Sequence, residues 1–153
     1  MKLFLRTVIA GILTAGSMVH AAEETPPDVL FAPADMADLS EFIWKKRPVL
    51  VFADNENDSS YIEQIELLHE NEADLIARDV IVLTDTDPAA RSALRMQMRP
   101  RGFMLVLVGK DGGTKMRKPF PWDVREITRS IDKMPIRQRE IRDEKERHGN
   151  IIE

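Results

Sequence analysis

The chain has no cysteine among its 153 residues. Thiol–disulfide exchange, thiol peroxidase chemistry and cysteine nucleophiles all need a thiolate, so these activities are excluded. Disulfide bonds, which are common in exported proteins, are excluded as well. The missing thiol separates this chain from every redox enzyme that works through cysteine.

Other patterns that carry chemistry are also missing. Beyond the N-terminal region only His69 and His148 remain, and there is no His/Cys cluster for zinc and no G-x-S-x-G nucleophile elbow. The segment Gly109–Lys115 superficially resembles a phosphate loop, but we expect it to join two strands instead of opening a helix. With a net charge of −4, the chain is a poor candidate for binding nucleic acid. We expect no catalytic residue, no cofactor and no metal ligand set.

The N-terminus has the pattern of a secretory signal peptide. Lys2 and Arg6 precede the apolar stretch Val8–Val19, which is too short to span a bilayer, and Ala21 completes a small-residue cleavage pattern. We predict that residues 1–21 are removed and that the mature protein is periplasmic or secreted, with no attachment to the membrane. An uncleaved anchor is the alternative.

Four regions are expected along the chain. Residues 1–21 form the signal peptide, 22–35 a proline-rich flexible or extended lead-in, 36–135 a single domain, and 136–153 a charged helical extension or tail. Apolar spacing and capping residues predict helices over Met36–Lys46, from a Ser60–Glu63 capping box to Ile76, over Ala89–Met98, and from Asp123 to Met134.

Three apolar stretches and one more polar stretch predict a small mixed sheet. Phe103–Val108 is apolar throughout, which indicates a strand covered on both faces, and Thr114–Lys118 returns after a tight turn as an edge strand. Val49–Ala53 and Val80–Leu83 flank a helix and therefore form a right-handed parallel crossover. The predicted fold is α/β and thioredoxin-like: four strands flanked by helices, in the order Val80–Leu83, Val49–Ala53, Phe103–Val108, Thr114–Lys118.

Several segments also resemble a known family, the domain of unknown function 4174, in its bacterial members. The resemblance covers roughly Leu39 to Glu144 and is carried by RPVLVFA, ARDVIVL, GFMLVLVGKDGGTKMR and IDKMPIRQREIRDE. It implies a thioredoxin-like fold and an exported setting, and related domains occur in some secreted vertebrate matrix proteins. It implies no activity, since the family has none established, and the absence of cysteine argues against the redox role suspected from its fold.

The carboxyl ends of the parallel strands are where ligands gather in such a sheet. The loop Asp54–Asp58, which holds the cysteine pair in a working thioredoxin, lies there, and the segments before and after the terminal hairpin meet it. The candidate binding residues at this edge are Asp54, Glu56, Asp58, Asp85, Arg99, Arg101 and Trp122.

Three interpretations of this edge stay open. In the first, the acidic residues only cap a helix and pair with Arg99 and Arg101. In the second they form a divalent-cation site, because Asp54, Glu56 and Asp58 have the spacing that opens a calcium loop, although Ser59 and Ile65 occupy the positions where that loop needs glycine and glutamate. The third interpretation is a partner-binding surface that uses the arginines with Phe120 and Trp122.

Two classes of function follow. The first is a redox-inactive, non-catalytic binding or structural module of the cell envelope, with a protein partner. The alternative is an enzyme without a thiol, in which a carboxyl group of the Asp54–Asp58 edge has a pKa raised by burial and acts as a general acid or base.

Overall fold

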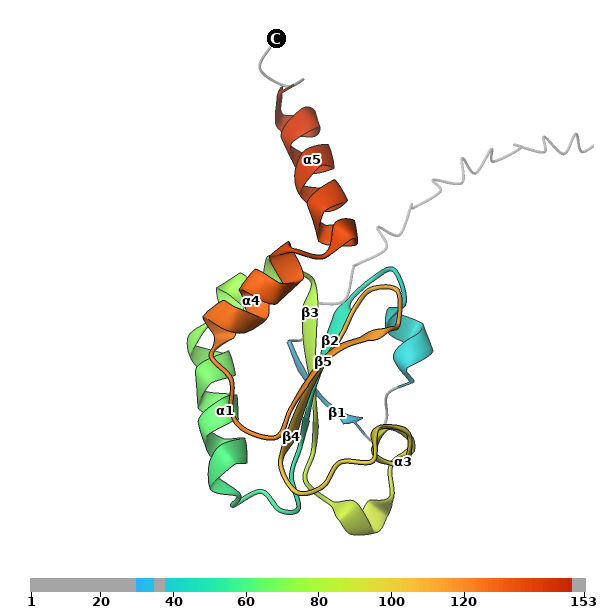
Figure 1. The fold of residues 1–153 in the computed structure, drawn as a ribbon, viewed down its shortest axis with the longest axis vertical. Coiled ribbons are helices and arrows are strands. Elements are labelled where there is room, and N and C mark those ends of the chain that lie inside the picture. The colour runs from blue at the N-terminus through green and yellow to red at the C-terminus, as the bar shows by residue number, and fades with distance from the viewer. Residues whose placement is uncertain (1–29, 35–37, 150–153) are drawn as a thin grey trace, which may run out of the picture.

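The computed structural model describes residues 30–34 and 38–149, so the predicted signal peptide and most of the lead-in lie outside the described residues. Its centre is a five-stranded mixed sheet in the order β1-β3-β2-β4-β5 (Figure 1). β1, β3 and β2 are mutually parallel, β4 runs antiparallel to β2, and β5 antiparallel to β4. The strands are β1 (Phe31–Pro33), β2 (Arg47–Phe52), β3 (Val80–Asp85), β4 (Met104–Val108) and β5 (Thr114–Lys118).

The predicted thioredoxin-like fold and the order of its four strands are confirmed, with one strand added. β1 lies in the stretch that was expected to be a lead-in, and it extends the sheet by pairing Phe31 with Val82. The sheet therefore has five strands, where four were predicted. β1 has only three residues and ends at Pro33, so it is too short for the alternation by which a strand is recognised in sequence.

The central strand β2 is buried along its whole length and defines two ends of the molecule. At one end Phe52 pairs with Asp85 of β3 and Met104 of β4; we call this the groove pole. At the other end Arg47 pairs with Val80, the first residue of β3; we call this the helix pole. Since β2 and β3 run the same way and β4 returns, the groove pole is the edge at which a ligand was expected.

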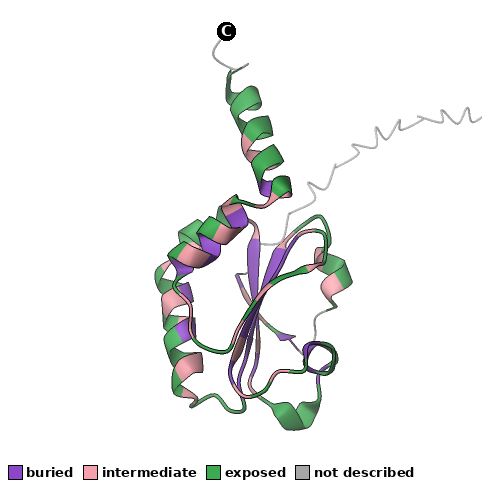
Figure 2. Ribbon diagram, in the orientation of Figure 1, coloured by how far each residue is buried: buried purple, intermediate pink, exposed green. Residues whose placement is uncertain are grey.

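Helices cover both faces of the sheet, and buried residues line the strands and the inner sides of the helices (Figure 2). One face is covered by α1, α2 and α4, through side chains such as Leu68, Leu75 and Ile127. The other face is covered by α3 and the short 3₁₀ helix η2. The bounds are η2 (Leu39–Phe42), α1 (Ser59–Glu70), α2 (Glu72–Ile76), η3 (Pro88–Ala90), α3 (Ala93–Met98), α4 (Val124–Asp132) and α5 (Pro135–Gly149).

α5 leaves the body at the helix pole and extends away from it (Figure 1). It begins at Pro135, the last residue of the predicted domain. Proline suits the first position of a helix because its missing N–H has no partner there in any case. None of the helices in the described part of the chain is both long and apolar enough to span a membrane.

The first predicted helix is wrong within the described residues. Met36 lies outside them, and the helical part is only η2, capped by Asp38 and followed by Trp44 in a left-handed conformation with φ of 63°. Left-handed backbone cannot continue an α-helix. Arg47, which directly follows the predicted helix, is the fully buried first residue of β2.

Two other predicted helices are interrupted. The helix expected from Ser60 to Ile76 breaks at Asn71 into α1 and α2, and its N-cap is Asp58 in place of Ser60. The stretch expected as one helix over Ala89–Met98 is split by Arg91, which has φ of 49°. Asp123 caps α4 as predicted, by accepting a hydrogen bond from a backbone N–H.

Candidate functional site

The expected edge forms at the groove pole, where two segments distant in sequence approach each other. Asp54 is the second residue after β2, following Ala53, and it is exposed. Its Oδ2 atom lies 3.9 Å from where a Cβ atom on Gly102 would stand, so the loop after β2 faces the segment that enters β4. Arg99 and Arg101 in that segment are exposed as well.

Two side chains of the acidic loop accept hydrogen bonds from backbone N–H groups a few residues further along the chain. Asp58 accepts a hydrogen bond from the N–H of Tyr61 at 3.0 Å and so caps α1, and Asn55 Oδ1 accepts one from the N–H of Asn57 at 2.9 Å. Among residues 30–34 and 38–149, neither Arg99 nor Arg101 forms an ion pair with Asp54, Glu56 or Asp58. The predicted cap is therefore present, whereas the predicted ion pairs are not.

No cation site is assembled at this edge. Within the described ranges, no three side chains of the histidine, aspartate or glutamate type come close enough to hold a metal ion. The i, i+2, i+4 spacing of Asp54, Glu56 and Asp58 does not bring the carboxylates together, because one of them turns back to cap α1. A calcium loop points its ligands inward around the ion, and this loop does not.

Asp85 is buried and paired with Arg95, a side chain that was not among the predicted site residues. Arg95 donates to Asp85 Oδ1 from Nη2 at 2.8 Å and from Nε at 3.0 Å, and the Ser92 hydroxyl donates to Oδ2 at 2.5 Å. All three side chains are buried. Burial alone raises the pKa of Asp85, but the hydrogen bonds from Arg95 and Ser92 outweigh it, and the pKa is lowered from its ordinary value.

Arg95 also ties two strand ends together. Its Nη2 atom donates to the backbone oxygens of Ala53 at 2.7 Å and Asp85 at 3.0 Å, where β2 and β3 end. A carboxylate held this way is ionised near neutral pH, whereas the enzymatic alternative required a carboxyl group at this edge with a raised pKa. Asp85 therefore anchors α3 to the sheet. The sequence did not reveal Arg95 as its partner because the pairing depends on where α3 lies, and this helix begins only after the break at Arg91.

Beside Arg99 and Arg101 lies an open groove of about 640 Å³. Arg117 of β5 also lines it, donating to the carbonyl of Met98 and lying 3.6 Å from the sulfur of Met104. Met96 is half exposed there. The lining residues are Met96, Gln97, Met98, Arg99, Arg101, Phe103, Met104, Arg117 and Pro119. The groove thus combines three arginines with methionine and phenylalanine, and it has no acidic residue in its lining.

Trp122 lies apart from this groove. Gln64 of α1, fully buried, donates to the carbonyl of Trp122 at 3.1 Å and accepts from its N–H at 2.7 Å, which fixes the loop after β5. The ammonium group of Lys118 lies 4.7 Å from the Trp122 ring centroid and 5.9 Å from that of Phe120. Trp122 lines a different depression, between β5 and α4, so the structure does not gather it with Arg99 and Arg101.

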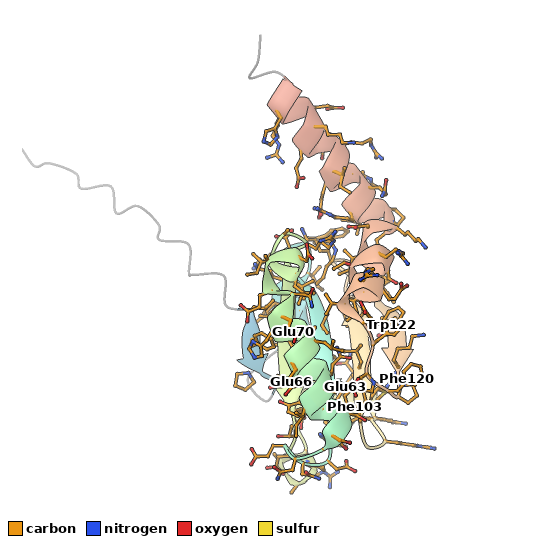
Figure 3. All side chains as sticks on the ribbon, turned by 90° about the vertical axis from the view of Figure 1, so that its left-hand side faces the viewer. Glu63, Glu66, Glu70, Phe103, Phe120 and Trp122 are labelled. Carbon is orange, nitrogen blue, oxygen red and sulfur yellow. The ribbon has the colours of Figure 1, made fainter. Side chains whose placement is uncertain are left out.

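One exposed side of α1 carries a row of carboxylates. Glu63, Glu66 and Glu70 follow one another along the helix, and Figure 3 shows them on the side of the molecule from which Phe120 and Trp122 can also be seen. The spacing of three and four residues puts them on one helix face. These glutamates were not among the predicted site residues, although their spacing is visible in the sequence.

Comparison with known proteins identifies relatives of the fold. Residues 38–140 match the family model described as "Domain of unknown function (DUF4174)". The reduced 2-Cys peroxiredoxin of Plasmodium vivax is similar in structure, with 17% identity, a TM-score of 0.51, and 63% of this chain and 81% of that chain covered. A chloroplastic thioredoxin z is similar at 17% identity and a TM-score of 0.51, with 69% and 96% covered. No curated protein matches the sequence. At this identity the likenesses show the thioredoxin-like fold alone.

Proposed function

The chain belongs to the DUF4174 family, and we propose that it is a non-catalytic binding module whose partner is a protein segment in the periplasm or outside the cell. The absence of cysteine supports a role without redox chemistry. In the loop that would hold the cysteine pair of a thioredoxin, Asp58 is the N-cap of α1. The signal-peptide pattern of residues 1–21 supports an exported location.

The observation that carries the proposal is the groove at the groove pole. Arg99, Arg101 and Arg117 line it, and the first two have no carboxylate partner among the described residues, so their guanidinium groups can form charge-assisted hydrogen bonds with carboxylates of a ligand. Met96 and Met104 provide flexible apolar contacts that adapt to different side chains. The occupant that fits is an extended peptide segment in which acidic side chains alternate with apolar ones.

The test uses a defined probe, a labelled peptide in which glutamate alternates with leucine, measured by fluorescence anisotropy. We expect the double variant Arg99→Glu/Arg101→Glu to weaken binding at least about tenfold, because two attractive charges become repulsive. Binding to the unchanged chain should weaken as salt is raised, since exposed charges are screened. The purified chain should show no turnover in thiol–disulfide, peroxidase or hydrolase assays.

The matched control is Arg139→Glu/Arg142→Glu, which makes the same change of charge on two exposed residues of α5. This control should bind the peptide as the unchanged chain does. Equal loss in both double variants would reduce the effect to net charge and contradict a site in the groove. Turnover in any of the three assays would contradict a non-catalytic module.

A further inference from the structure

The strand β5 lies at one edge of the sheet and pairs on one side only. Its partner there is β4, with Val106 opposite Arg117 and Leu107 opposite Met116. On its other side, β5 pairs with no strand among the described residues. Alternate residues of an edge strand turn their backbone N–H and C=O groups outward, where an additional strand can pair with them. The other edge, β1, offers less, because it has three residues and ends in a proline that has no N–H to donate.

Side chains of β5 alternate between two hollows that lie on either side of the strand. Arg117 lines the groove at the groove pole, whereas Met116 and Lys118 line the depression of about 400 Å³ between β5 and α4. We call the second hollow the Trp122 depression. The register agrees with this alternation, since Val106 packs with the core under α3 and Leu107 with the core under α4. A strand added to β5 would alternate in the same way, so its successive side chains would face the groove and the Trp122 depression in turn.

The groove side of β5 favours acidic side chains. Arg117 is exposed, and among the described residues its guanidinium group meets only uncharged acceptors, the carbonyl oxygen of Met98 and the sulfur of Met104. Arg99 and Arg101 line the same groove without a carboxylate partner there. Three guanidinium groups on one side of the edge strand can therefore bind the carboxylates of a ligand.

The Trp122 depression favours apolar side chains. Met116, Trp122 and Met134 line it and also pack against the apolar core on that face of the sheet. Two of its lysines already have partners, since Lys115 pairs with Asp111 at 2.6 Å and the ammonium group of Lys118 lies over the ring of Trp122. The two sides of β5 thus differ in the side chains they would accept.

We propose that the peptide segment bound in the groove adds to the sheet as a sixth strand, paired with the free edge of β5. Its acidic side chains lie over the groove and its apolar side chains over the Trp122 depression. This inference rests on the proposed function and states how the partner is held, by its backbone as well as by its side chains. It also gives a reason for the alternation, because a period of two places each kind of side chain on one face of a strand.

The charges of β5 select against a second copy of this chain. Pairing two β5 strands edge to edge would bring Lys115, Arg117 and Lys118 of both copies together, and like charges on neighbouring strands repel. Thr114 is opposite Val108 and Met116 opposite Leu107, so Lys115 is the extra residue of a β-bulge. Cations and bulges both hinder association between edges. An acidic strand is attracted by the same cations.

The main test uses the glutamate–leucine peptide and two versions with methylated backbone nitrogens, one methylated at every glutamate and the other at every leucine. In an extended strand the glutamate N–H groups point to one edge and the leucine N–H groups to the other. Measured by anisotropy on the mature chain, one version should bind like the unmodified peptide and the other at least about tenfold more weakly. The version that fails reports the direction of the added strand.

Two further measurements test the two faces of the added strand. A peptide of the same composition that repeats Glu-Glu-Leu-Leu puts half of its glutamates over the Trp122 depression and should bind at least about tenfold more weakly. In a Trp44→Phe chain, the emission of Trp122 should shift to shorter wavelength when the alternating peptide binds, because leucine side chains then cover the ring.

Hydrogen exchange of the backbone amides locates the added strand. The alternating peptide should slow exchange within β5 and leave the amide of Phe31, on the other edge of the sheet, unchanged. Strand addition at β5 is overturned if both methylated peptides bind alike, if the paired peptide binds like the alternating one, or if protection appears at β1 in place of β5. It is also overturned if β5 is already protected in a dimer of the free chain.

Failure of this inference is distinguishable from failure of the proposed function. If the unmodified peptide binds and Arg99→Glu/Arg101→Glu weakens it, while both methylated versions bind alike, the groove remains the binding site and strand addition is wrong. If the unmodified peptide does not bind the mature chain at all, the proposed function is contradicted and this inference fails with it.

Discussion

Glu140 of α5 binds Arg47 of β2 across 93 residues of sequence, with both carboxylate oxygens within 3.1 Å of Nη2 of the arginine. Arg47 is fully buried, and its Nη1 donates to the carbonyl of Arg78 at 2.8 Å. Lys110 binds the same carboxylate. Ion pairs therefore hold the N-terminal part of α5 against the central strand. Apolar packing contributes little there, since the buried residue of this helix is Arg137.

The first prediction concerns this ion pair. Glu140→Gln should lower the free energy of unfolding by about 3 kcal/mol, because the buried Arg47 then keeps only its longer contact with the carboxylate of Asp79, at 3.9 Å. The measurement is urea unfolding followed by circular dichroism. Glu146→Gln, an exposed change of the same type on α5, should shift the free energy by less than about 0.5 kcal/mol.

Removing both partners tests the origin of that loss. Arg47→Met combined with Glu140→Leu should recover much of the stability, because no uncompensated charge stays buried. If the double variant is less stable than Glu140→Gln alone, the cluster contributes more through its other members than through this pair.

The second prediction is a loss of stability in acid. Burial tends to raise the pKa of Glu140, but Lys110 and Arg47 outweigh it and lower the pKa. The hydrogen bond from Arg78 lowers the pKa of Asp132. A carboxyl group whose folded pKa is lowered stabilises the fold above its unfolded pKa, and this stabilisation is lost as the pH falls through the folded value.

Unfolding by urea should therefore show constant stability near pH 7 and a decline below about pH 4. In Glu140→Gln the decline should be shallower, since one of the responsible groups no longer titrates. An identical pH dependence in the variant and the unchanged chain would assign the acid sensitivity to other carboxylates.

The third prediction separates anchoring from binding at Asp85. Asp85→Ala leaves Arg95 buried without its carboxylate and should cost about 3 kcal/mol of stability. Below its melting temperature the folded variant should still bind the glutamate–leucine peptide, because Asp85 does not line the groove and acts on it only through the position of α3. Thermal unfolding and anisotropy are the two measurements. Loss of binding without loss of stability would make Asp85 a ligand-binding residue.

The fourth prediction concerns Gln64, whose side chain makes both hydrogen bonds to the backbone of Trp122. Gln64→Leu leaves that N–H and carbonyl without partners and should destabilise the chain by about 2 kcal/mol. In a Trp44→Phe background the fluorescence reports Trp122 alone, and its emission should shift to longer wavelength as the ring becomes more exposed. An unchanged spectrum would show that packing against Lys118 is enough to hold the loop.

The apolar strands were predictable because they are buried on both faces. Val49–Ala53, Val80–Leu83 and Phe103–Val108 are continuous apolar runs, and the central strands of the structure cover nearly the same residues. The single crossover and the hairpin then leave few ways to order them. The prediction that the groove pole gathers the loop after β2 and the segment before β4 rests on strand direction alone.

The buried charges were not predictable in the same way. Arg47, Arg95 and Lys110 look like surface residues in sequence. The two arginines become buried and the lysine largely buried only because a carboxylate from another element meets each of them. Charged residues are almost never fully buried unless they are paired, and the pairing depends on tertiary structure. Left-handed residues such as Trp44 and Arg91, which cut predicted helices short, likewise carry no local signal because they are not glycine or asparagine.

The position of β2 between β3 and β4 also sets the order in which parts of the chain open. Its amides are held on both sides and covered on both faces, so their hydrogen exchange requires unfolding of the whole domain. The three-residue edge strand β1 and the exposed distal turns of α5 have few contacts to lose and exchange through local opening. Since Glu140 connects α5 to β2, the boundary between fast and slow exchange along α5 should fall close to that residue.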